Sequence, residues 1–565
     1  MIVLAKLIQL AQFLEHEAMH NFSAENIDWS SYLKGYDLIY HGPSRCWQDG
    51  FTLGNGELSS IAYESEGFYP EWTLNHVGLW DERLPNFKRF DMAHMRRIAA
   101  GELPFISEMK KEDPVDIEDR YIPTPKYGGQ VRLAFGLPPQ YAPGHRISKR
   151  LDLHRSFLET SLDKHLSHPR IRSFVCADRN LLVISVRKVS LVSAFKNRVE
   201  LFRISEPDLE TTRGSLEKGF MLLKQKLPTL KYVLAAKIVP CGGGEYREFF
   251  EKITDRSNHG WGIPSSSVEP VCKEEGLYAE IKGDFDVFLT IAIDKGGSSP
   301  ERIVQQRLEQ AVAYGSDQLF AEHCSWWGEF WSKNYVSLGE PFLDQLWYLS
   351  NYHLRCCLGG YPAQGLCGPW LGRTPGSSHF LPWNGNYTND YNAQLPLMVP
   401  GRINRPELAD AAFRMLFDQL PAARKNAAAC EQSGALYPLT SGPGGEEISG
   451  GCYRFCQGSG PYWSVVLYQH YLLTKDECFL RETAYPIMRE VANFFAGYMH
   501  WNEDQYCYAL SMSQNPELMY LHFKNPIDTL AFLKYTLKAS IDSAKFLGED
   551  REIRKKWKHV LTHFP

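Results

Sequence analysis

The sequence predicts an α+β protein of several domains, in which a large β-sandwich precedes a helical domain. The chain has 565 residues, more than one hydrophobic core usually holds. Its first half carries short runs of β-branched and aromatic residues between Pro and Gly, which is typical of strands. In its second half almost every apolar segment has helical period, and long loops rich in Gly, Pro, Asn and Ser separate these segments.

Residues 1–27 are predicted to form a helical extension. Apolar residues at positions 3, 4, 7, 8, 10, 11 and 14 follow the period of an amphipathic helix. Lys6 and Gln9 interrupt the apolar run, no basic region precedes it, and no small-x-small cleavage site follows it, so a signal peptide is not expected. No stretch approaches the length of a membrane span. We therefore expect a cytoplasmic protein without membrane partners.

Residues 28–298 are predicted to form the β-sandwich domain. So many strand-like runs without interleaved helices indicate a large antiparallel sandwich. The clearest runs are Leu181–Arg187, Val199–Ile204, Leu230–Val239 and Phe285–Ile293.

A helical linker over residues 299–338 and a helical barrel over residues 339–565 are predicted to follow. About 230 residues with such long loops are few for a closed ring of helical hairpins, so we expect a barrel truncated at its C-terminus. The segments with helical spacing are Pro300–Gly315, Ser316–Trp331, Glu340–Leu358, Pro406–Gln419, Pro461–Leu473, Phe479–His500 and Pro526–Phe546.

Charge and cysteine content exclude several classes of function. The net charge is −5, from 61 basic and 66 acidic residues, and the absence of a basic run argues against nucleic acid as a partner. The thirteen cysteines include no two close pairs at zinc spacing, which favours free thiols in a reducing compartment. No metal, nucleotide or phosphate-loop motif is present, so no cofactor is expected.

The most informative segment is Pro382–Gln394. Its thirteen residues hold one carboxylate, four asparagines, a glutamine and three aromatic rings. Aromatic faces stack on sugar rings, amides bridge vicinal hydroxyl groups, and a carboxylate in a cleft acts as a base or positions a water. The second carboxyl group that glycoside hydrolysis needs is offered by Ser513–Glu517. The alternative interpretation is an Asn/Gly-rich loop whose side chains cap turns.

The chain resembles glycoside hydrolase family 95, the inverting α-L-fucosidases and their relatives in the six-hairpin glycosidase superfamily. Several sequence blocks in the right order carry this resemblance, and together they are more specific than any one motif. In the β domain they are Trp47–Leu58, Leu74–Trp80 and Arg150–Leu153; in the helical half they are Tyr361–Trp370, Pro382–Gln394, Tyr462–Trp463, His470–Leu480, Ala484–Pro486 and Ser511–Glu517, followed by Asp528.

The resemblance implies an N-terminal β-supersandwich, a helical linker, an (α/α)6 barrel and a C-terminal β domain. This chain would contain the first two parts and most of the third. The family's activity implies an exo-acting, inverting glycosidase that removes a terminal α-L-fucosyl or related α-L-galactosyl residue from an oligosaccharide or glycoconjugate.

The resemblance also implies the catalytic groups. Glu517 would be the general acid. The alternative interpretation is that Glu517 is a solvated residue at the start of a helix, just after Pro516. The family orients the attacking water with an Asn-x-Asn pair, assisted by a distant Asp that would lie outside this chain. Here the corresponding residues are Asp390 and Asn392, so the first amide is replaced by a carboxylate that can take the proton of the water directly. Asn389 would be the matching amide if the loop is shifted by one residue.

Further candidates for substrate binding come from both domains. Trp383, Tyr387 and Trp370 are candidate stacking platforms, with core packing as the alternative. His470, on a predicted helix, would either contact a sugar hydroxyl group or be a core histidine whose hydrogen bonds are made within the protein. The remaining candidates are Gln394 in the base loop and Asn55, which lies between two glycines and either shapes a turn or reaches the barrel mouth.

Two other functions stay open. One is a hydrolase or phosphorylase of another (α/α)6 family, although no phosphate-binding cluster is recognisable beside the base loop. The other is a catalytically inactive or fragmentary relative that only binds carbohydrate. The sequence does not determine the sugar, the linkage, the pH optimum or the oligomeric state.

Overall fold

The computed structural model describes most of the chain, with gaps at several loops. The described residues are 27–44, 47–65, 69–84, 97, 102, 123–135, 146–163, 168–189, 197–206, 208–215, 219–242, 245–256, 272–294, 296, 299–371, 381–449, 453, 455–513, 515 and 524–565. The predicted N-terminal helix, apart from Ile27, and the predicted acid Glu517 lie outside these ranges.

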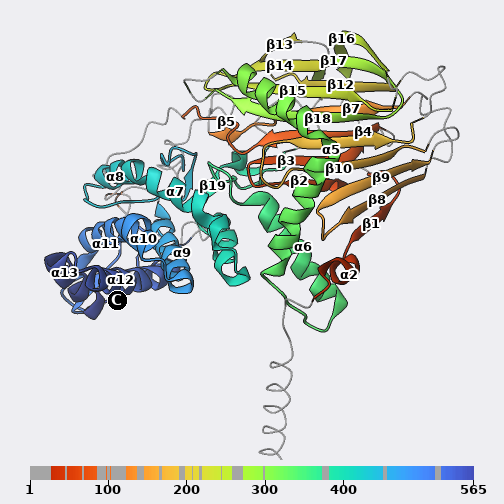
Figure 1. Cartoon of the computed structure of the whole chain (residues 1–565). Helices are drawn as coiled ribbons and strands as arrows, with labels where there is room; N and C mark the ends of the chain where they lie inside the picture. The colour runs from red at the N-terminus through yellow and green to blue at the C-terminus, as the bar shows by residue number, and fades with distance from the viewer. Residues whose placement is uncertain are drawn as a thin grey trace, which may run out of the picture.

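Two large antiparallel sheets form the N-terminal part of the molecule (Figure 1). The nine-stranded sheet has the order β1 (Leu38–His41), β8 (Arg146–Asp152), β9 (Phe157–Asp163), β10 (Arg170–Val175), β11 (Leu182–Arg187), β18 (Phe285–Ile293), β15 (Lys231–Pro240), β14 (Phe220–Lys226) and β13 (Glu210–Gly214). The seven-stranded sheet has the order β16 (Glu245–Arg256), β17 (Cys272–Lys282), β12 (Asn197–Ile204), β7 (Gly129–Ala134), β4 (Tyr69–His76), β3 (Leu58–Ser65) and β2 (Phe51–Gly54).

Strand β18 shows how the sheets are packed. All nine of its residues are buried, because the nine-stranded sheet is covered on both faces. Val287, Leu289 and Ile291 belong to the core shared with the seven-stranded sheet. Phe288 and Ala292 belong instead to a second core with the helix α5. Because successive side chains of β18 point to opposite faces of the sheet, this one strand contributes to two apolar layers.

Helix α5 (Pro300–Ser332) joins the sheets to the helical part. It is kinked at Gly315, whose φ of 74° and ψ of 156° are not helical, so the two helices predicted there meet at this residue. The first half packs on the nine-stranded sheet through Val304 and Leu308. In the second half Trp327 contacts Tyr352 of α6 (Pro341–Cys357), with ring centroids 5.5 Å apart.

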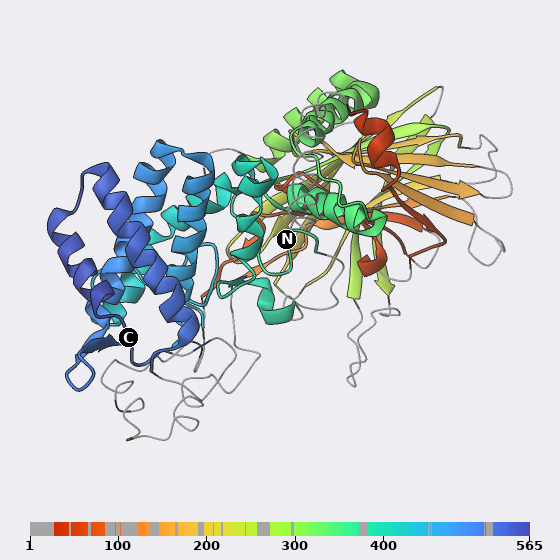
Figure 2. The same ribbon diagram turned by 90° about the horizontal axis from the view of Figure 1, so that it is seen from below.

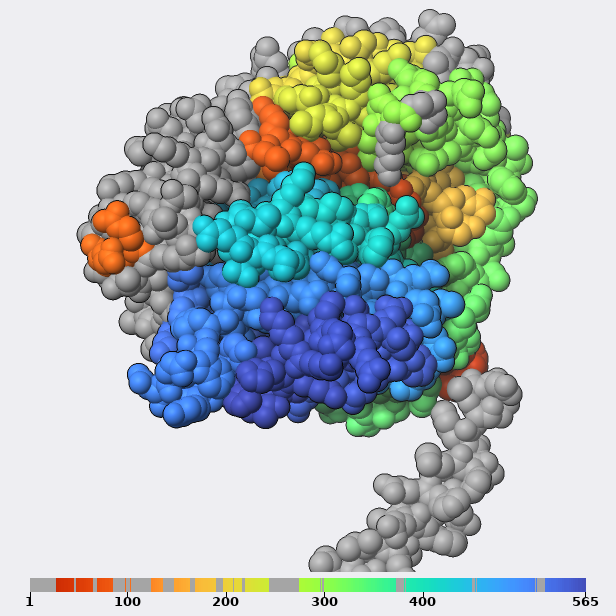
Figure 3. Space-filling view, turned by 90° about the vertical axis from the view of Figure 1, so that its left-hand side faces the viewer, coloured from red at the N-terminus to blue at the C-terminus, as the bar shows by residue number. Residues whose placement is uncertain are grey.

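The remaining elements are mainly helices, which lie beside one edge of the β domain (Figures 1 and 2). The space-filling view shows this part, in cyan to dark blue, packed directly against the sheets (Figure 3). The predicted fold class, an N-terminal β-sheet domain followed by a helical part, is confirmed. Its principal elements are α7 (Asp410–Asp418), α8 (Leu420–Ala429), α9 (Ser459–Thr474), α10 (Glu477–Phe479), the π-helical turn η11 (Leu480–Ala484), α11 (Tyr485–Tyr498), α12 (Ile527–Leu547) and α13 (Arg551–Thr562).

Short elements complete the described fold. They are helix α2 (Trp29–Lys34), the 3-10 turns η2 (Trp47–Asp49), η6 (Pro382–Gly385), η7 (Leu395–Met398), η8 (Pro400–Ile403) and η9 (Pro406–Ala409), and the strand pairs β5 (Trp80–Asp81) with β6 (Thr124–Pro125), β19 (Tyr387–Thr388) with β20 (Thr440–Ser441), and β21 (His500–Asn502) with β22 (Cys507–Ala509).

A tight turn between β2 and β3 locks the β domain to the end of α6. The backbone N–H of Gly56 donates to the carbonyl oxygen of Cys356 at 2.9 Å, and Arg355 Nη1 donates to the carbonyl oxygen of Asn55 at 2.5 Å. Gly56 has a φ of +87°, and a Cβ atom on it would lie 2.0 Å from the carbonyl oxygen of Leu358. Only glycine fits this contact.

We therefore expect Gly56→Ala to destabilise the protein by about 1–3 kcal/mol, because the substitution combines an unfavourable φ with a backbone clash. The measurement is urea unfolding followed by tryptophan fluorescence. Gly214→Ala is the matched control, because a Cβ there meets no atom within 4 Å; its effect should stay within about 0.5 kcal/mol. Equal stability of the two variants would contradict the interlock.

Candidate active site

The base loop begins at strand β19 and is held by two buried amides. Asn389 is 5% exposed, and its Nδ2 donates to the carbonyl oxygen of Pro438 at 3.1 Å. Its backbone N–H donates to the carbonyl oxygen of Leu439 at 2.7 Å. Gln394 is fully buried, and its Nε2 donates to the carbonyl oxygen of Asn389 at 2.7 Å. Both predicted binding residues are therefore placed where they shape the loop.

The same fold of the loop presents Asp390 and Asn392. The Asn389–Gln394 bond and the bond from Ala393 N–H to the carbonyl oxygen of Thr388, at 3.1 Å, close the loop on itself. Asp390 is half-buried and Asn392 is exposed on the surface of a pocket. A partly desolvated carboxylate beside an amide has the composition needed to hold a water molecule and to accept its proton.

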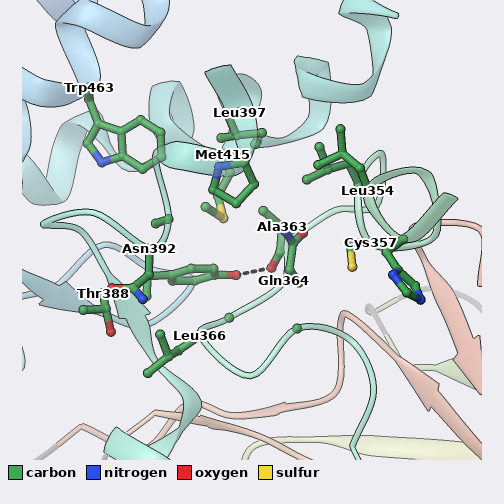
Figure 4. A pocket seen from close by; sticks show the side chains of 18 of the residues that line it. Leu354, Cys357, Ala363, Gln364, Leu366, Thr388, Asn392, Leu397, Met415 and Trp463 are labelled. Carbon is green, nitrogen blue, oxygen red and sulfur yellow. Dashed lines mark hydrogen bonds between the residues drawn. The ribbon is translucent and has the colours of Figure 1, made fainter. Parts of the chain in front are cut away.

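The pocket under this loop has a volume of about 400 Å³ (Figure 4). The loop, α6, α7 and α9 surround it, and its walls are largely apolar. Its polar edge includes Asn392, Thr388, Gln364 and His353. Burial lowers the pKa of His353, which favours the neutral imidazole. Trp463, on α9, presents its indole ring to the same pocket (Figure 4).

The three candidate stacking platforms have different surroundings. Tyr387 lines the pocket but is 3% exposed. Its ring stacks on Trp80 with centroids 5.1 Å apart, and its hydroxyl group donates to the carbonyl oxygen of Ala363 at 2.5 Å. Trp370 is half-buried at the domain interface, where its Nε1 donates to the carbonyl oxygen of Leu53 at 2.9 Å. Trp383 is 72% exposed. Of the three rings, Trp383 therefore has its surface open to a ligand.

Two other candidates lie in structural positions. His470 is 7% exposed and packs between Phe413 and Phe479, with ring centroids 4.9 and 4.7 Å away. Burial lowers the pKa of its imidazole. Asn55 holds its turn: its Oδ1 accepts from the backbone N–H of Leu58 at 2.8 Å, and its Nδ2 donates to the carbonyl oxygen of Cys176 at 3.0 Å.

The predicted acid loop is described at its two ends. Asn525 N–H donates to the carbonyl oxygen of Leu510 at 2.7 Å, and Leu510 N–H donates to Asn525 Oδ1 at 2.8 Å. These bonds bring the two ends of segment 511–524 together at the start of α12. Ser513 in this segment is fully buried.

The structure adds groups that sequence reasoning did not assign to the site. Burial raises the pKa of Asp528, in the first turn of α12, and the negative charge of Asp390 adds to the rise. His353 and Trp463 line the pocket. The sequence block Tyr462–Trp463 carried part of the family resemblance and was the available signal for Trp463. Nothing in local sequence pairs Asp528 with Asp390, because that interaction depends on helix packing.

The described part of the chain contains neither a metal-binding cluster nor a membrane-spanning helix. Among these residues no group of three or more His, Cys, Asp or Glu side chains is arranged to hold a metal ion. None of the helices that the structure describes combines the length and the apolar composition needed to cross a bilayer. Ten of the cysteines in the described ranges carry free thiols.

Several known proteins are similar to the chain. A kojibiose hydrolase of Flavobacterium johnsoniae is 25% identical over 199 residues, which are 34% of this chain and 28% of that protein. A kojibiose phosphorylase of Caldanaerobacter subterraneus is 22% identical over 319 residues, which are 52% of this chain and 40% of that protein. A periplasmic/secreted acid trehalase of Candida glabrata is 29% identical over 156 residues, which are 25% of this chain and 12% of that protein. The chain therefore spans well under half the length of these relatives.

Among solved structures, a putative kojibiose phosphorylase from the human microbiome has the same fold. The TM-score is 0.64 at 12% sequence identity, and the superposition covers 94% of this chain and 70% of the other.

The helical half also matches a family profile. Residues 356–565, which begin at the end of α6 and include the base loop, the pocket residue Trp463 and α12, match the glycosyl hydrolase family 95 catalytic domain. Residues 356–565 of the chain are therefore similar to glycosyl hydrolase family 95 catalytic domains, and the base loop lies within this similar part.

Proposed function

We propose that the chain is an exo-acting, inverting glycoside hydrolase that removes a terminal α-L-fucosyl or related α-L-galactosyl residue. The observation that supports the proposal is the base loop, which lies inside the matched domain and carries Asn392, a residue of the pocket wall, two positions after Asp390. The substrate is an oligosaccharide or glycoconjugate, and the reducing cytoplasm is the proposed compartment.

In the proposed mechanism Asp390 accepts a proton from the attacking water while Asn392 orients it. Glu517 donates a proton to the leaving glycosidic oxygen. Inversion needs room for the water, so the two carboxyl groups should be about 6.5–9.5 Å apart. Asn389 and Gln394 act through the backbone by holding the loop in place. Trp383, the most exposed of the candidate rings, is the proposed stacking surface for the outer part of the substrate.

We expect Asp390→Asn and Glu517→Gln each to lower kcat by a factor of about 10² or more, because each removes a proton-transfer group. The measurement is turnover of aryl α-L-fucosides, aryl α-L-galactosides, kojibiose and trehalose. Glu503→Gln, which changes an exposed turn residue, is the matched control. The unfolding midpoint of each variant should stay close to that of the wild type. Full turnover in both variants would contradict the assignment of the site.

A phosphorylase is the second candidate, because a curated relative and a solved structure with the same fold are both named kojibiose phosphorylase. Hydrolysis and phosphorolysis differ in the group that attacks the anomeric carbon. If Asp390 activates water, the rate of substrate loss should be the same with and without inorganic phosphate, and the product should be the free sugar. A strict requirement for phosphate, with a sugar phosphate as product, would favour the second candidate.

If the chain binds sugars but cleaves none of them in either condition, a non-catalytic carbohydrate-binding function replaces both candidates.

A further inference from the structure

Helices α9 and α12 pack side by side and run in the same direction. Tyr462 and Phe532 stack with ring centroids 4.4 Å apart, and Thr536 Oγ1 donates to the carbonyl oxygen of Pro461 at 3.2 Å. Closer to the two helix starts, a Cβ atom on Gly458 would lie 3.0 Å from Thr529 Oγ1. The N-termini of both helices therefore meet at one end of the pair, beside the closed ends of segment 511–524.

Buried polar atoms gather around this end. Five of them have no partner within hydrogen-bond distance among the described residues: Gln457 Oε1, Ser459 Oγ, Ser513 Oγ, Asn515 Oδ1 and Asp528 Oδ1. Three of their side chains are almost completely buried, with exposed fractions of 3% for Gln457, 2% for Ser459 and 0% for Ser513. A buried polar atom without a partner is unfavourable, and sugar hydroxyl groups would supply what is missing.

Asp528 is the ionisable member of this cluster. Burial raises the pKa of its carboxyl group. Hydrogen bonds from backbone N–H groups of the first turn and from the Thr529 side chain lower this pKa, whereas the negative charge of Asp390 raises it further. The facing first turn of α9, from Ser459 to Tyr462, carries no charged side chain. No described lysine or arginine forms an ion pair with Asp528 that would offset the effect of the Asp390 charge on its pKa.

We propose that Asp528 is a further binding residue of the candidate site: its carboxyl group faces Asp390 across the site and hydrogen-bonds a hydroxyl group of the terminal sugar. This inference rests on the proposed function and adds a third carboxyl group to it. The role is binding and positioning, because proton transfer to and from the reacting atoms is already assigned to Asp390 and Glu517.

The pairing of the two carboxyl groups is tested without any substrate. Asp residues are labelled with ¹³C at the carboxyl carbon, and the signal of Asp528 is identified by its loss in Asp528→Asn. The pKa of Asp528 should fall in Asp390→Asn, because the substitution removes the like charge that disfavours ionisation. An unchanged pKa of Asp528 would overturn the inference.

The contact with sugar is tested by calorimetric titration with L-fucose and L-galactose, together with KM for the aryl glycoside that is turned over. Asp528→Asn should weaken sugar binding about tenfold and raise KM, with a smaller change in kcat. It should also shift the acid limb of kcat/KM to lower pH, because Asp390 then ionises without a like charge nearby. Asp410→Asn is the matched control: Asp410 also lies in the first turn of a helix, α7, and burial raises its pKa as well.

The outcomes separate the two claims. Turnover by the wild type with an unchanged KM and pH profile in Asp528→Asn would overturn the role of Asp528 and leave the proposed function standing. Absence of turnover and of sugar binding in the wild type would contradict the proposed function and the sugar contact together; the carboxyl titration then decides the pairing with Asp390. An equal loss of binding in Asp410→Asn would show a general effect on the helical part and overturn the specific contact.

Discussion

The site depends on the contact between the Gly54–Gly56 turn and the end of α6. The β domain and the helical part meet there through a backbone hydrogen bond from Gly56 to Cys356, and the approach is too close for any side chain at Gly56. Asn55 stiffens the turn from within, because its side chain bonds to the turn itself and to the neighbouring β10–β11 connection. Since this geometry has little freedom, the β domain fixes where α6 ends.

The segment after α6 carries that constraint to the pocket. Ser59 Oγ donates to the carbonyl oxygen of Pro369 at 2.5 Å, and Asn75 Nδ2 donates to the carbonyl oxygen of Leu371 at 2.7 Å, so strands β3 and β4 hold the chain at residues 369–371. Residues 363–366 of the same segment line the pocket opposite Asn392. The β domain thus forms part of the support of the site although its own residues lie outside the pocket. Buried amides of the base loop, Asn389 and Gln394, supply the remaining support.

The fold class could be predicted from sequence because it depends on period. Nine buried residues in β18 and the helical spacing of α9 and α12 are visible in the order of apolar residues alone. The roles of single polar and aromatic residues were less accessible. Composition cannot distinguish an open ring such as Trp383 from a ring stacked inside the interface such as Tyr387, because both lie in one Asn-rich segment. That distinction is set by contacts with residues distant in sequence.

Asp528 illustrates the same limit for charge. It follows a Pro at the start of a helix, a position that helix geometry alone would explain. Its proposed role rests on the parallel packing of α9 and α12, which brings the starts of the two helices together. No local sequence pattern encodes that packing.

The central claim is that a water molecule, activated at Asp390, attacks the anomeric carbon from the face opposite to the leaving group. The most direct test is the anomeric configuration of the first-formed sugar, followed by proton NMR during hydrolysis of an aryl α-L-fucoside or α-L-galactoside. The account predicts that the β-anomer appears first and mutarotates later. The α-anomer as the first product would contradict it, because retention requires a covalent intermediate and a closer pair of carboxyl groups.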